Sequence, residues 1–327
     1  MTNASHNEAP SCRVRLEPER HDELHADLDH WRANVGGPVA VDCAARAPAS
    51  ISGVDVLSWN IAIGLGRLDQ VLHRLRTEAT HMAGVDESRP LVILVQEAFR
   101  SDDSVPDVPG GVHHGGKVPG TARTDVVEFA RAHGLALRYS PSMRNGTHAS
   151  DRGNAILSTV QLTDAHAFLL PYVRQRRVVV TARIAGHDEL AFASAHLDTH
   201  GRPRKGGGSA RVGAGRAAQA RALADRLRDV PGSLVLGADL NSMFGMSDPA
   251  VRELVAGGMH PARRVGNWRH TFHTRLRLLL DHVLYRCDDR HIRDCEVTRI
   301  DEAPGDRTRG VFGSDHHPLL ARFDLVH

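Results

Sequence analysis

Cysteine is scarce in this chain, and its spacing argues against one class of site. The 327 residues contain four cysteines, at positions 12, 43, 287 and 295, and no two of them form the CxxC pair of a zinc finger. A structural zinc site is therefore not expected. Cys287 and Cys295 flank a polar turn, and either a disulfide across a hairpin or two buried thiols would fit this spacing.

Long apolar runs and a surplus of one charge are also missing. No stretch of about 18 apolar residues occurs, and the N-terminus lacks a basic segment followed by an apolar one. We therefore expect a soluble, cytoplasmic protein without a membrane span, unless a secretion signal has been removed. The 41 basic and 39 acidic residues give a formal charge of +2, so an anionic partner would have to be attracted locally.

Hydrophobic patterning divides the chain into an N-terminal extension and one large domain. Apolar residues make up 41% of the chain and charged residues 24%, which is typical of a globular protein with a substantial core. Residues 1–50 are predicted to form a helix, with Leu24, Leu28 and Trp31 on one face, followed by a linker. We expect this helix to cover a sheet edge, with autoinhibition as the alternative. The main domain is predicted to span 51–327.

Strands and helices alternate along the main domain, and several strands are hairpin-like neighbours. This order favours an α/β fold with a pair of mixed β-sheets covered by helices over a purely parallel sheet. The expected strands cover 54–61, 91–97, 154–159, 176–184, 191–197, 233–240, 278–285 and 317–325, and the expected helices lie near 67–80, 123–133 and 212–228.

Polar side chains stand at the ends of several apolar strands. Asn60, Glu97, His196 and Asp239 each follow such a run, and Asn241 comes two residues after the last of them. A single case is usually a turn former or a helix cap. Five cases indicate a site, because strand ends on one rim converge and a buried acid or imidazole needs a partner such as a metal or a substrate.

The C-terminal part of the domain adds three candidates. Asp281 lies within the apolar run LLLDHVL, and Asp315 and His316 stand at the entry of the last strand. A carboxylate inside a strand is costly unless it is paired, and an imidazole is a suitable partner. We therefore predict that Asp281 holds His316.

The chain carries in order the motifs LSWNI, VQE, RGNAILS, SAHLD, GADLN, LDHVL and SDHHP. Together they resemble the endonuclease/exonuclease/phosphatase superfamily with the DNase I-like fold, over residues 54–326. The resemblance implies a four-layer α/β/β/α sandwich of two mixed β-sheets flanked by helices. It also implies a divalent-metal-dependent hydrolase that cleaves phosphodiester bonds with a metal-assisted, activated water.

The resemblance assigns a metal site as well. It makes Glu97 the principal Mg²⁺ ligand, with Asn60 beside it and Asp315 on the same side, and Mn²⁺ is the alternative ion. Ala62 departs from the pattern, because some family members carry a metal-binding acid at this position. The number of metal ions and their affinity therefore stay open.

The remaining motif residues receive catalytic roles from the resemblance. Asp239 would orient or deprotonate the attacking water, while Asn241 and His196 donate hydrogen bonds to the transition state. His316, oriented by Asp281, would complete a phosphate clamp or act as general base.

Two residues of the RGNAILS motif are predicted to bind substrate, namely Arg152 and Asn154. A surface salt bridge is the alternative for Arg152. His317 is interpreted as a substrate contact at most.

A nuclease is the preferred reading, because the basic, glycine-rich segment 201–216 follows His196 and could track a phosphate backbone. The alternative is a phospholipid (sphingomyelinase-like) or inositol-phosphate phosphoesterase. The apolar segment 165–173 could then form a lipid-facing tip, although a place in the core is the favoured interpretation of this segment. Aromatic residues are only 4% of the chain, which disfavours lipid. An inactive binding module is the least favoured reading, since no motif residue is missing. The sequence gives no oligomeric state.

Overall fold

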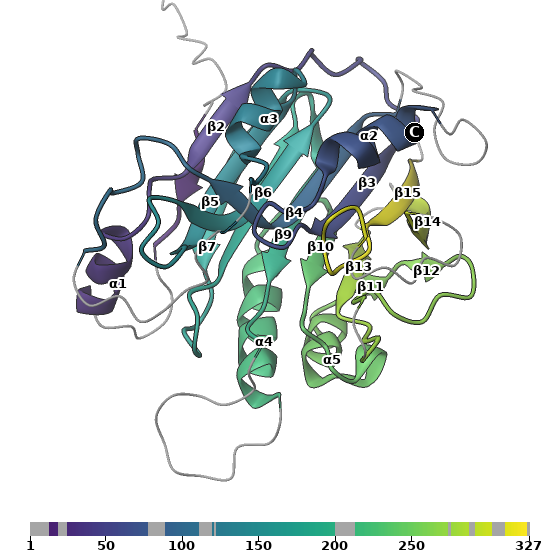
Figure 1. The fold of residues 1–327 in the computed structure, drawn as a ribbon. Helices are drawn as coiled ribbons and strands as arrows, with labels where there is room; N and C mark the ends of the chain where they lie inside the picture. The colour runs from purple at the N-terminus through teal and green to yellow at the C-terminus, as the bar shows by residue number, and fades with distance from the viewer. Residues whose placement is uncertain are drawn as a thin grey trace, which may run out of the picture.

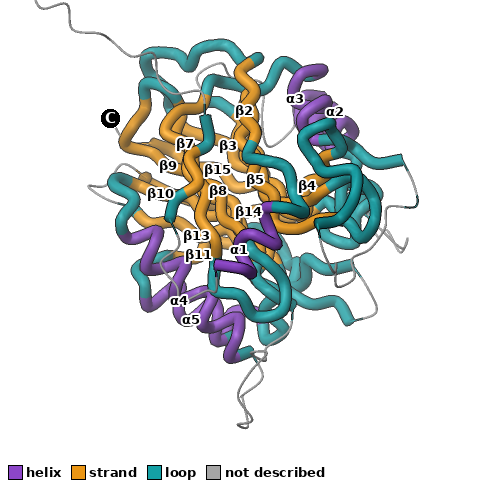
Figure 2. The backbone as a smooth tube through the Cα atoms, turned by 90° about the vertical axis from the view of Figure 1, so that its left-hand side faces the viewer, coloured by secondary structure: helices purple, strands orange, loops and turns teal. Residues whose placement is uncertain are grey.

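Two β-sheets packed face to face form the centre of the molecule, and helices cover both outer faces (Figure 1). The computed structural model describes residues 13–18, 25–77, 89–110, 120, 122–199, 213–273, 276–287, 292–302 and 311–325. Figure 2 shows the strands lying between two pairs of helices. The expected four-layer α/β/β/α sandwich is therefore confirmed.

One sheet has seven described strands and the other has eight, and both are mixed. The seven-stranded sheet runs in the order β1 (Arg15–Leu16), β7 (Leu162–Leu169), β8 (Val178–Ile184), β9 (His187–His196), β10 (Ser233–Asp239), β13 (Asp281–Arg286), β11 (His260–Pro261). The eight-stranded sheet runs in the order β12 (Arg263–Arg264), β14 (Ile292–Arg299), β15 (Leu319–Leu325), β3 (Gly53–Asn60), β4 (Leu91–Arg100), β6 (Asp151–Ser158), β5 (Ala136–Arg144), β2 (Val39–Asp42).

The helices pack on the sheets through apolar side chains. Helices α2 (Leu68–Thr77) and α3 (Val126–Ala132) cover the eight-stranded sheet, whereas α4 (Ala214–Arg228) and α5 (Pro249–Ala256) cover the seven-stranded one. A short 3-10 turn, η1 (Gly245–Ser247), leads into α5. None of the described helices has the length and hydrophobicity of a transmembrane segment.

Both faces of the central strands are buried, which explains their continuous apolar runs. In β3 the side chains of Val54 and Val56 enter the core between the sheets, while Leu57 and Trp59 pack beneath α2 and α3. Successive side chains of a strand point to opposite faces, so each face needs its own apolar residues. The runs predicted as strands from their hydrophobicity therefore coincide with the centre of the sandwich.

The N-terminal extension joins both sheets. Strand β1 pairs parallel with β7, and β2 pairs antiparallel with β5, so each sheet receives one strand from this segment. Helix α1 (His25–Arg32) buries Leu28 and Trp31. Leu24 lies outside the described residues. The sequence did not indicate β2, which falls in the expected linker, because a four-residue edge strand has little apolar pattern.

The lipid-facing tip is not formed. The segment 165–173 continues β7 into the core, where Phe168, Leu169 and Leu170 are buried and only Tyr172 is exposed. A lipid-binding tip requires several exposed apolar side chains, so the segment belongs to the core, as the favoured interpretation of its sequence had it.

The cysteines carry thiols. Cys43, Cys287 and Cys295 form no disulfide within the described part of the chain, while Cys12 lies outside it. Of the two alternatives for the hairpin, the structure has the thiol form.

Candidate active site

The register of the strands brings the predicted polar residues to one rim. In the seven-stranded sheet, Asp239 at the end of β10 pairs with His196 at the end of parallel β9 and with Asp281 at the start of antiparallel β13. Asn60 ends β3 in the other sheet, and its Nδ2 donates to Asp239 Oδ2 over 2.8 Å. His316 lies just before β15. The rim therefore joins both sheets at one site.

Asp239 is the centre of this rim. Its Oδ1 accepts a hydrogen bond from the backbone N–H of Asn241 at 2.9 Å, and its Oδ2 lies 3.3 Å from His196 Nε2 and 3.8 Å from His316 Nε2. The Asn241 side chain lies 3.1 Å from His196 Nε2 and donates to the Leu197 carbonyl at 2.9 Å. One carboxylate thus touches four of the predicted residues directly.

Asp281 and His316, which the sequence predicts as a pair, are in contact. His316 Nδ1 and Asp281 Oδ2 are 2.8 Å apart, and both side chains are buried. Asp281 is the first residue of β13 rather than an interior one, and the Thr271 hydroxyl accepts from its backbone N–H at 3.0 Å. The backbone of His316 is fixed as well, because its carbonyl accepts from the Trp59 indole at 2.8 Å.

Burial and neighbouring charges shift the pKa values of His316, Asp239 and His196. Burial opposes a charged imidazole, but Asp281 and Asp239 outweigh it and raise the pKa of His316 to about 10. Burial and the Asp281 carboxylate raise the pKa of Asp239 to about 7. Burial, with Arg177 and His316 nearby, lowers the pKa of His196 well below 6.5. Near neutral pH the site therefore holds one imidazolium, one neutral imidazole and one carboxyl group close to its midpoint.

Glu97 occupies a strained position on the same rim. It lies in β4 at a bulge, directly after Gln96, which pairs with Asn60, and its φ is +52°. Left-handed backbone is unfavourable for a glutamate, and such strain is typical of functional sites. Ala62 and Asn241, at φ +50° and +49°, share this conformation. The backbone thus holds Glu97 in a conformation that glutamate does not favour, whereas Asn241 is of a residue type that adopts it more readily.

Three arginines surround Glu97. Arg123, Arg152 and Arg177 each interact electrostatically with its carboxylate. Arg177 is buried, and its charge also interacts with that of Asp239. Neither Arg123 nor Arg177 was predicted as a site residue from the sequence. The one signal for Arg177 was its place directly before the apolar strand β8, where a buried cation needs an anionic partner.

The two RGNAILS residues differ in surroundings. Arg152 is only 8% exposed and donates to Asn145 Oδ1 at 2.8 Å, so its guanidinium does not form a surface salt bridge. Asn154 donates to the carbonyls of Val178 at 2.7 Å and Ser194 at 3.4 Å, which joins the two sheets. Its donors are used inside the sandwich, and its role as a substrate contact stays a prediction.

Two motif glycines permit close packing next to the site. A Cβ on Gly153 would lie 1.9 Å from the Ser140 carbonyl oxygen, and one on Gly237 would lie 2.6 Å from Ser58 Oγ and 2.8 Å from Leu94 Cδ1. Any side chain would push β6 from β5, or β10 from the facing sheet. These glycines of RGN and GADLN therefore set the distance between elements that carry site residues.

Asp315 lies at the outer side of the site. Its side chain is 46% exposed, and its Oδ1 is 3.9 Å from His316 Nε2. Most of the predicted basic segment, residues 201–212, lies outside the described residues; the described end of it, 213–216, begins α4.

The oxygen donors of the site suit a hard divalent cation. Glu97, Asn60 and Asp315 offer carboxylate and amide oxygens, which Mg²⁺ prefers. Asp281 Oδ1 is buried without a hydrogen-bond partner among the described residues, and the ligand atoms of Asp239, Asp281 and His316 lie within 4.8 Å of one another. The carboxylate and amide oxygens of Glu97, Asn60 and Asp315 therefore fit a bound divalent metal, whereas Asp239 and Asp281 have protonated His316 as their counter-charge.

Comparison with known proteins agrees with this geometry. The sequence model of the Endonuclease/Exonuclease/phosphatase family matches residues 57–316. No curated protein sequence matches the chain.

Solved structures share the fold at low sequence identity. The human Nocturnin catalytic domain with bound sulfate anion has a TM-score of 0.52 and 15% identity, and the match covers 88% of this chain and 98% of that domain. The 3′ phosphatase NExo from Neisseria, bound to product DNA hairpin, has a TM-score of 0.51 and 19% identity over 83% of this chain and 99% of that one. Truncated TDP2 from Caenorhabditis elegans has a TM-score of 0.51 and 16% identity, and the match covers 83% of this chain and 97% of that one.

Proposed function

Because the chain belongs to the endonuclease/exonuclease/phosphatase family of hydrolytic phosphoesterases, we propose that it hydrolyses phosphodiester bonds with the help of a divalent metal ion. The observation that carries the proposal is the contact of Asp239 with Asn60, His196, Asn241 and His316 at a rim shared by both sheets. This arrangement supplies an acceptor for a water proton beside donors for a charged phosphoryl group.

The metal ion would be held by Glu97, Asn60 and Asp315, as the resemblance implies. When bound, it would neutralise phosphate charge and polarise the bond to phosphorus, and Mg²⁺ is the ion that the oxygen donors favour, with Mn²⁺ as the alternative.

Asp239 is the group best suited to activate the attacking water. Its carboxyl pKa of about 7 places it near its midpoint at neutral pH, where an acid or base works most efficiently. Asn60 and the Asn241 N–H fix its two oxygens. We therefore assign to Asp239 the role of orienting the water and accepting its proton.

His316 is the group best suited to stabilise negative charge on the phosphoryl oxygens. The Asp281 carboxylate keeps its imidazole protonated and aims it toward Asp239. Neutral His196 and the Asn241 amide lie beside it, 3.1 Å from each other, and the resemblance assigns both as hydrogen-bond donors to the transition state. These preorganised donors cost no reorientation during the reaction, which is the main source of such electrostatic stabilisation.

A nucleic acid is the substrate that we favour. The buried guanidinium groups of Arg152 and Arg177 near Glu97 provide the local attraction for phosphate that the small net charge of the chain does not. The similar NExo structure is of a 3′ phosphatase bound to DNA. The lipid alternative loses its main support, because the apolar segment 165–173 is largely buried.

A panel of substrates tests this proposal. We expect Mg²⁺- or Mn²⁺-dependent cleavage of bis-p-nitrophenyl phosphate and plasmid DNA, with loss of turnover in EDTA and in Asp239→Ala. Sphingomyelin and an inositol polyphosphate should be turned over more slowly. Turnover of sphingomyelin or the inositol polyphosphate without DNA cleavage would assign the same site to the alternative substrate class. The absence of turnover with every compound would contradict the proposed hydrolase activity.

The pH dependence tests the assigned protonation states. We expect kcat/KM for bis-p-nitrophenyl phosphate at saturating Mg²⁺ to fall as pH drops below about 7, because protonated Asp239 cannot accept a proton. It should fall again above about 10, where His316 loses its charge. A constant kcat/KM between pH 5 and 7, measured with enzyme shown to be folded, would contradict the role of Asp239.

A further inference from the structure

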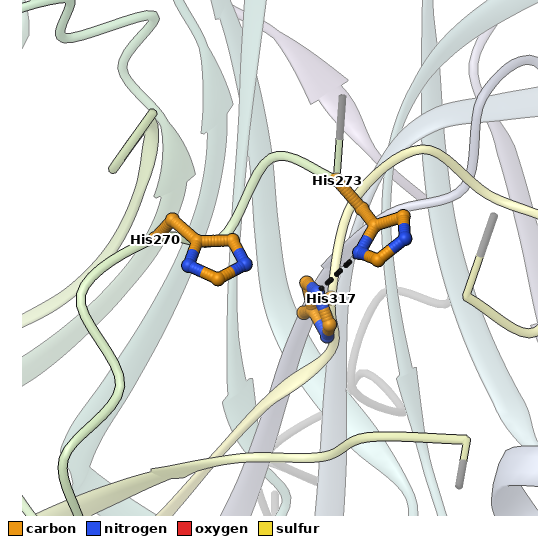
Figure 3. Close-up of side chains that lie close together, drawn as sticks. All are labelled: His270, His273 and His317. Carbon is orange, nitrogen blue, oxygen red and sulfur yellow. Dashed lines mark hydrogen bonds between the residues drawn. The ribbon is translucent and has the colours of Figure 1, made fainter. Parts of the chain in front are cut away.

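A cluster of three histidines lies beside the active site. His270 and His273 come from the segment between β12 and β13, and His317 follows the catalytic candidate His316. One ring nitrogen of each histidine lies within 4.8 Å of those of the other two. Figure 3 shows the three imidazoles around a common space, with His317 between the other two.

The distances suit coordination by nitrogen. His273 Nδ1 and His317 Nε2 are 3.2 Å apart. Zinc–nitrogen bonds are about 2.0–2.1 Å long, so two ligands of a tetrahedral ion are separated by about 3.3 Å. The pair therefore already has the separation that one shared ion requires, and a small approach of the His270 ring would complete a three-nitrogen set.

Neighbouring groups orient the rings. The Asp301 carboxylate lies 2.8 Å from His317 Nδ1, which leaves Nε2 to face His273. A carboxylate on the outer nitrogen of a histidine is the usual support for a metal ligand, because it fixes the ring and raises its basicity. Arg299 Nη1 lies 3.2 Å from His270 Nε2, so this guanidinium would have to move aside for a metal ion. Its repulsion of the ion is offset in part by the Asp301 carboxylate, 2.8 Å from Arg299 Nε.

Protonation and access also favour a ligand role. Burial, with Arg299, His317, Arg277 and His273 nearby, lowers the pKa of His270 to about 4, so its ring is neutral near pH 7. His317 is buried, whereas His270 and His273 are half-buried and can be reached from solvent. Neutral imidazole is the form that binds metals.

We propose that His270, His273 and His317 bind a borderline transition-metal ion such as Zn²⁺, at a site distinct from the oxygen-donor site of Glu97. Three nitrogen ligands leave a fourth position for water or an anion. Imidazole donors prefer Zn²⁺ over Mg²⁺, so the two sites differ in the ion they select.

The proposed site is coupled to the active site through Thr271. The Thr271 carbonyl accepts from the His317 N–H at 2.7 Å, and its hydroxyl accepts from the Asp281 N–H at 3.0 Å. The His273 N–H donates to the carbonyl of Asp315 at 2.6 Å. A metal ion on the three rings would therefore stabilise the segments that hold Asp281 and His316.

Titration of EDTA-dialysed protein with Co²⁺ in saturating Mg²⁺ tests the proposal, because nitrogen-bound Co²⁺ absorbs visible light. We expect one equivalent to bind with this absorption and Zn²⁺ to displace it. His270→Ala and His273→Ala should each weaken binding at least about 100-fold, and Asp301→Asn about 10–100-fold. His260→Ala, at an exposed strand position, and Glu97→Ala should retain it.

Either of two results would overturn the site. These are the absence of a Co²⁺ spectrum in the wild-type protein, and full Co²⁺ affinity in both histidine variants. Circular dichroism of each variant establishes that it is folded. Since the measurement needs no substrate, its outcome is independent of the proposed hydrolase function.

Discussion

Glu97→Ala is expected to abolish metal-dependent turnover while leaving the fold intact. Glu97 is the only acid among the proposed metal ligands that lies within a central strand, and its half-buried carboxylate interacts with Arg123, Arg152 and Arg177. Its loss removes the main anionic ligand, so Mg²⁺ should no longer bind at working concentrations. Because the buried guanidinium groups of Arg152 and Arg177 would lose this counter-charge, the thermal midpoint should fall, and circular dichroism establishes that the variant is folded.

Two measurements check this expectation, namely the hydrolysis of bis-p-nitrophenyl phosphate and calorimetric titration with Mg²⁺. Glu128→Gln is the matched control, because this glutamate is exposed in the first turn of α3 and belongs to none of the proposed ligand sets. Turnover or Mg²⁺ affinity at the wild-type level in Glu97→Ala would remove Glu97 from the metal site.

His316→Ala should lower kcat at least about 10²-fold, the scale of a lost acid–base or electrostatic group. It should also destabilise the protein by about 3–5 kcal/mol, because two buried carboxylates, Asp239 and Asp281, would lose their counter-charge. The folded-state pKa of about 10 exceeds the ordinary value of 6.5. The stabilisation is therefore fully present below pH 6.5 and is lost as the pH rises through about 10.

A second variant separates the role of the ring from its stabilising effect. Asp281→Asn keeps the imidazole but removes its largest favourable partner, so the pKa of His316 should fall and the alkaline limb of kcat/KM should move to lower pH. Asp281 is thus a positioning residue. His260→Gln is the matched histidine control. A near-normal rate in His316→Ala, measured where the variant is folded, would place the charge-stabilising role elsewhere.

Those parts of the fold that are apolar over a whole strand could be predicted from the sequence. Strands β3, β4 and β10 lie where their runs of branched and aliphatic residues indicated, because each is buried on both faces. Strands β2, β5 and β14 were not expected, since their polar residues, such as Arg138 and Arg299, interrupt the apolar pattern. In the structure Arg138 is buried through contacts with Asp42 and with backbone carbonyls.

Most residues of the candidate site, but not their contacts, could be predicted from the sequence. Asn60, His196, Asp239, Asn241, Asp281 and His316 stand at strand ends or in motifs, and the structure brings them into one hydrogen-bonded group. Their catalytic roles stay predictions. Arg177, His270 and His273 were not predicted, because they lie in no motif whose spacing indicates their partners. His317 lies in the SDHHP motif but was interpreted only as a substrate contact.

The sequence by itself determined the sandwich, the family resemblance and the polar residues of the rim, because hydrophobic runs and short motifs are local properties of a chain. Tertiary structure alone decided which residues meet. Strand register placed Asp239 between His196 and Asp281, and packing of one sheet on the other brought Asn60 to it. The segment before β13 then set His270 and His273 beside His317. Such contacts join residues far apart in the chain, and their distances depend on how the sheets pack.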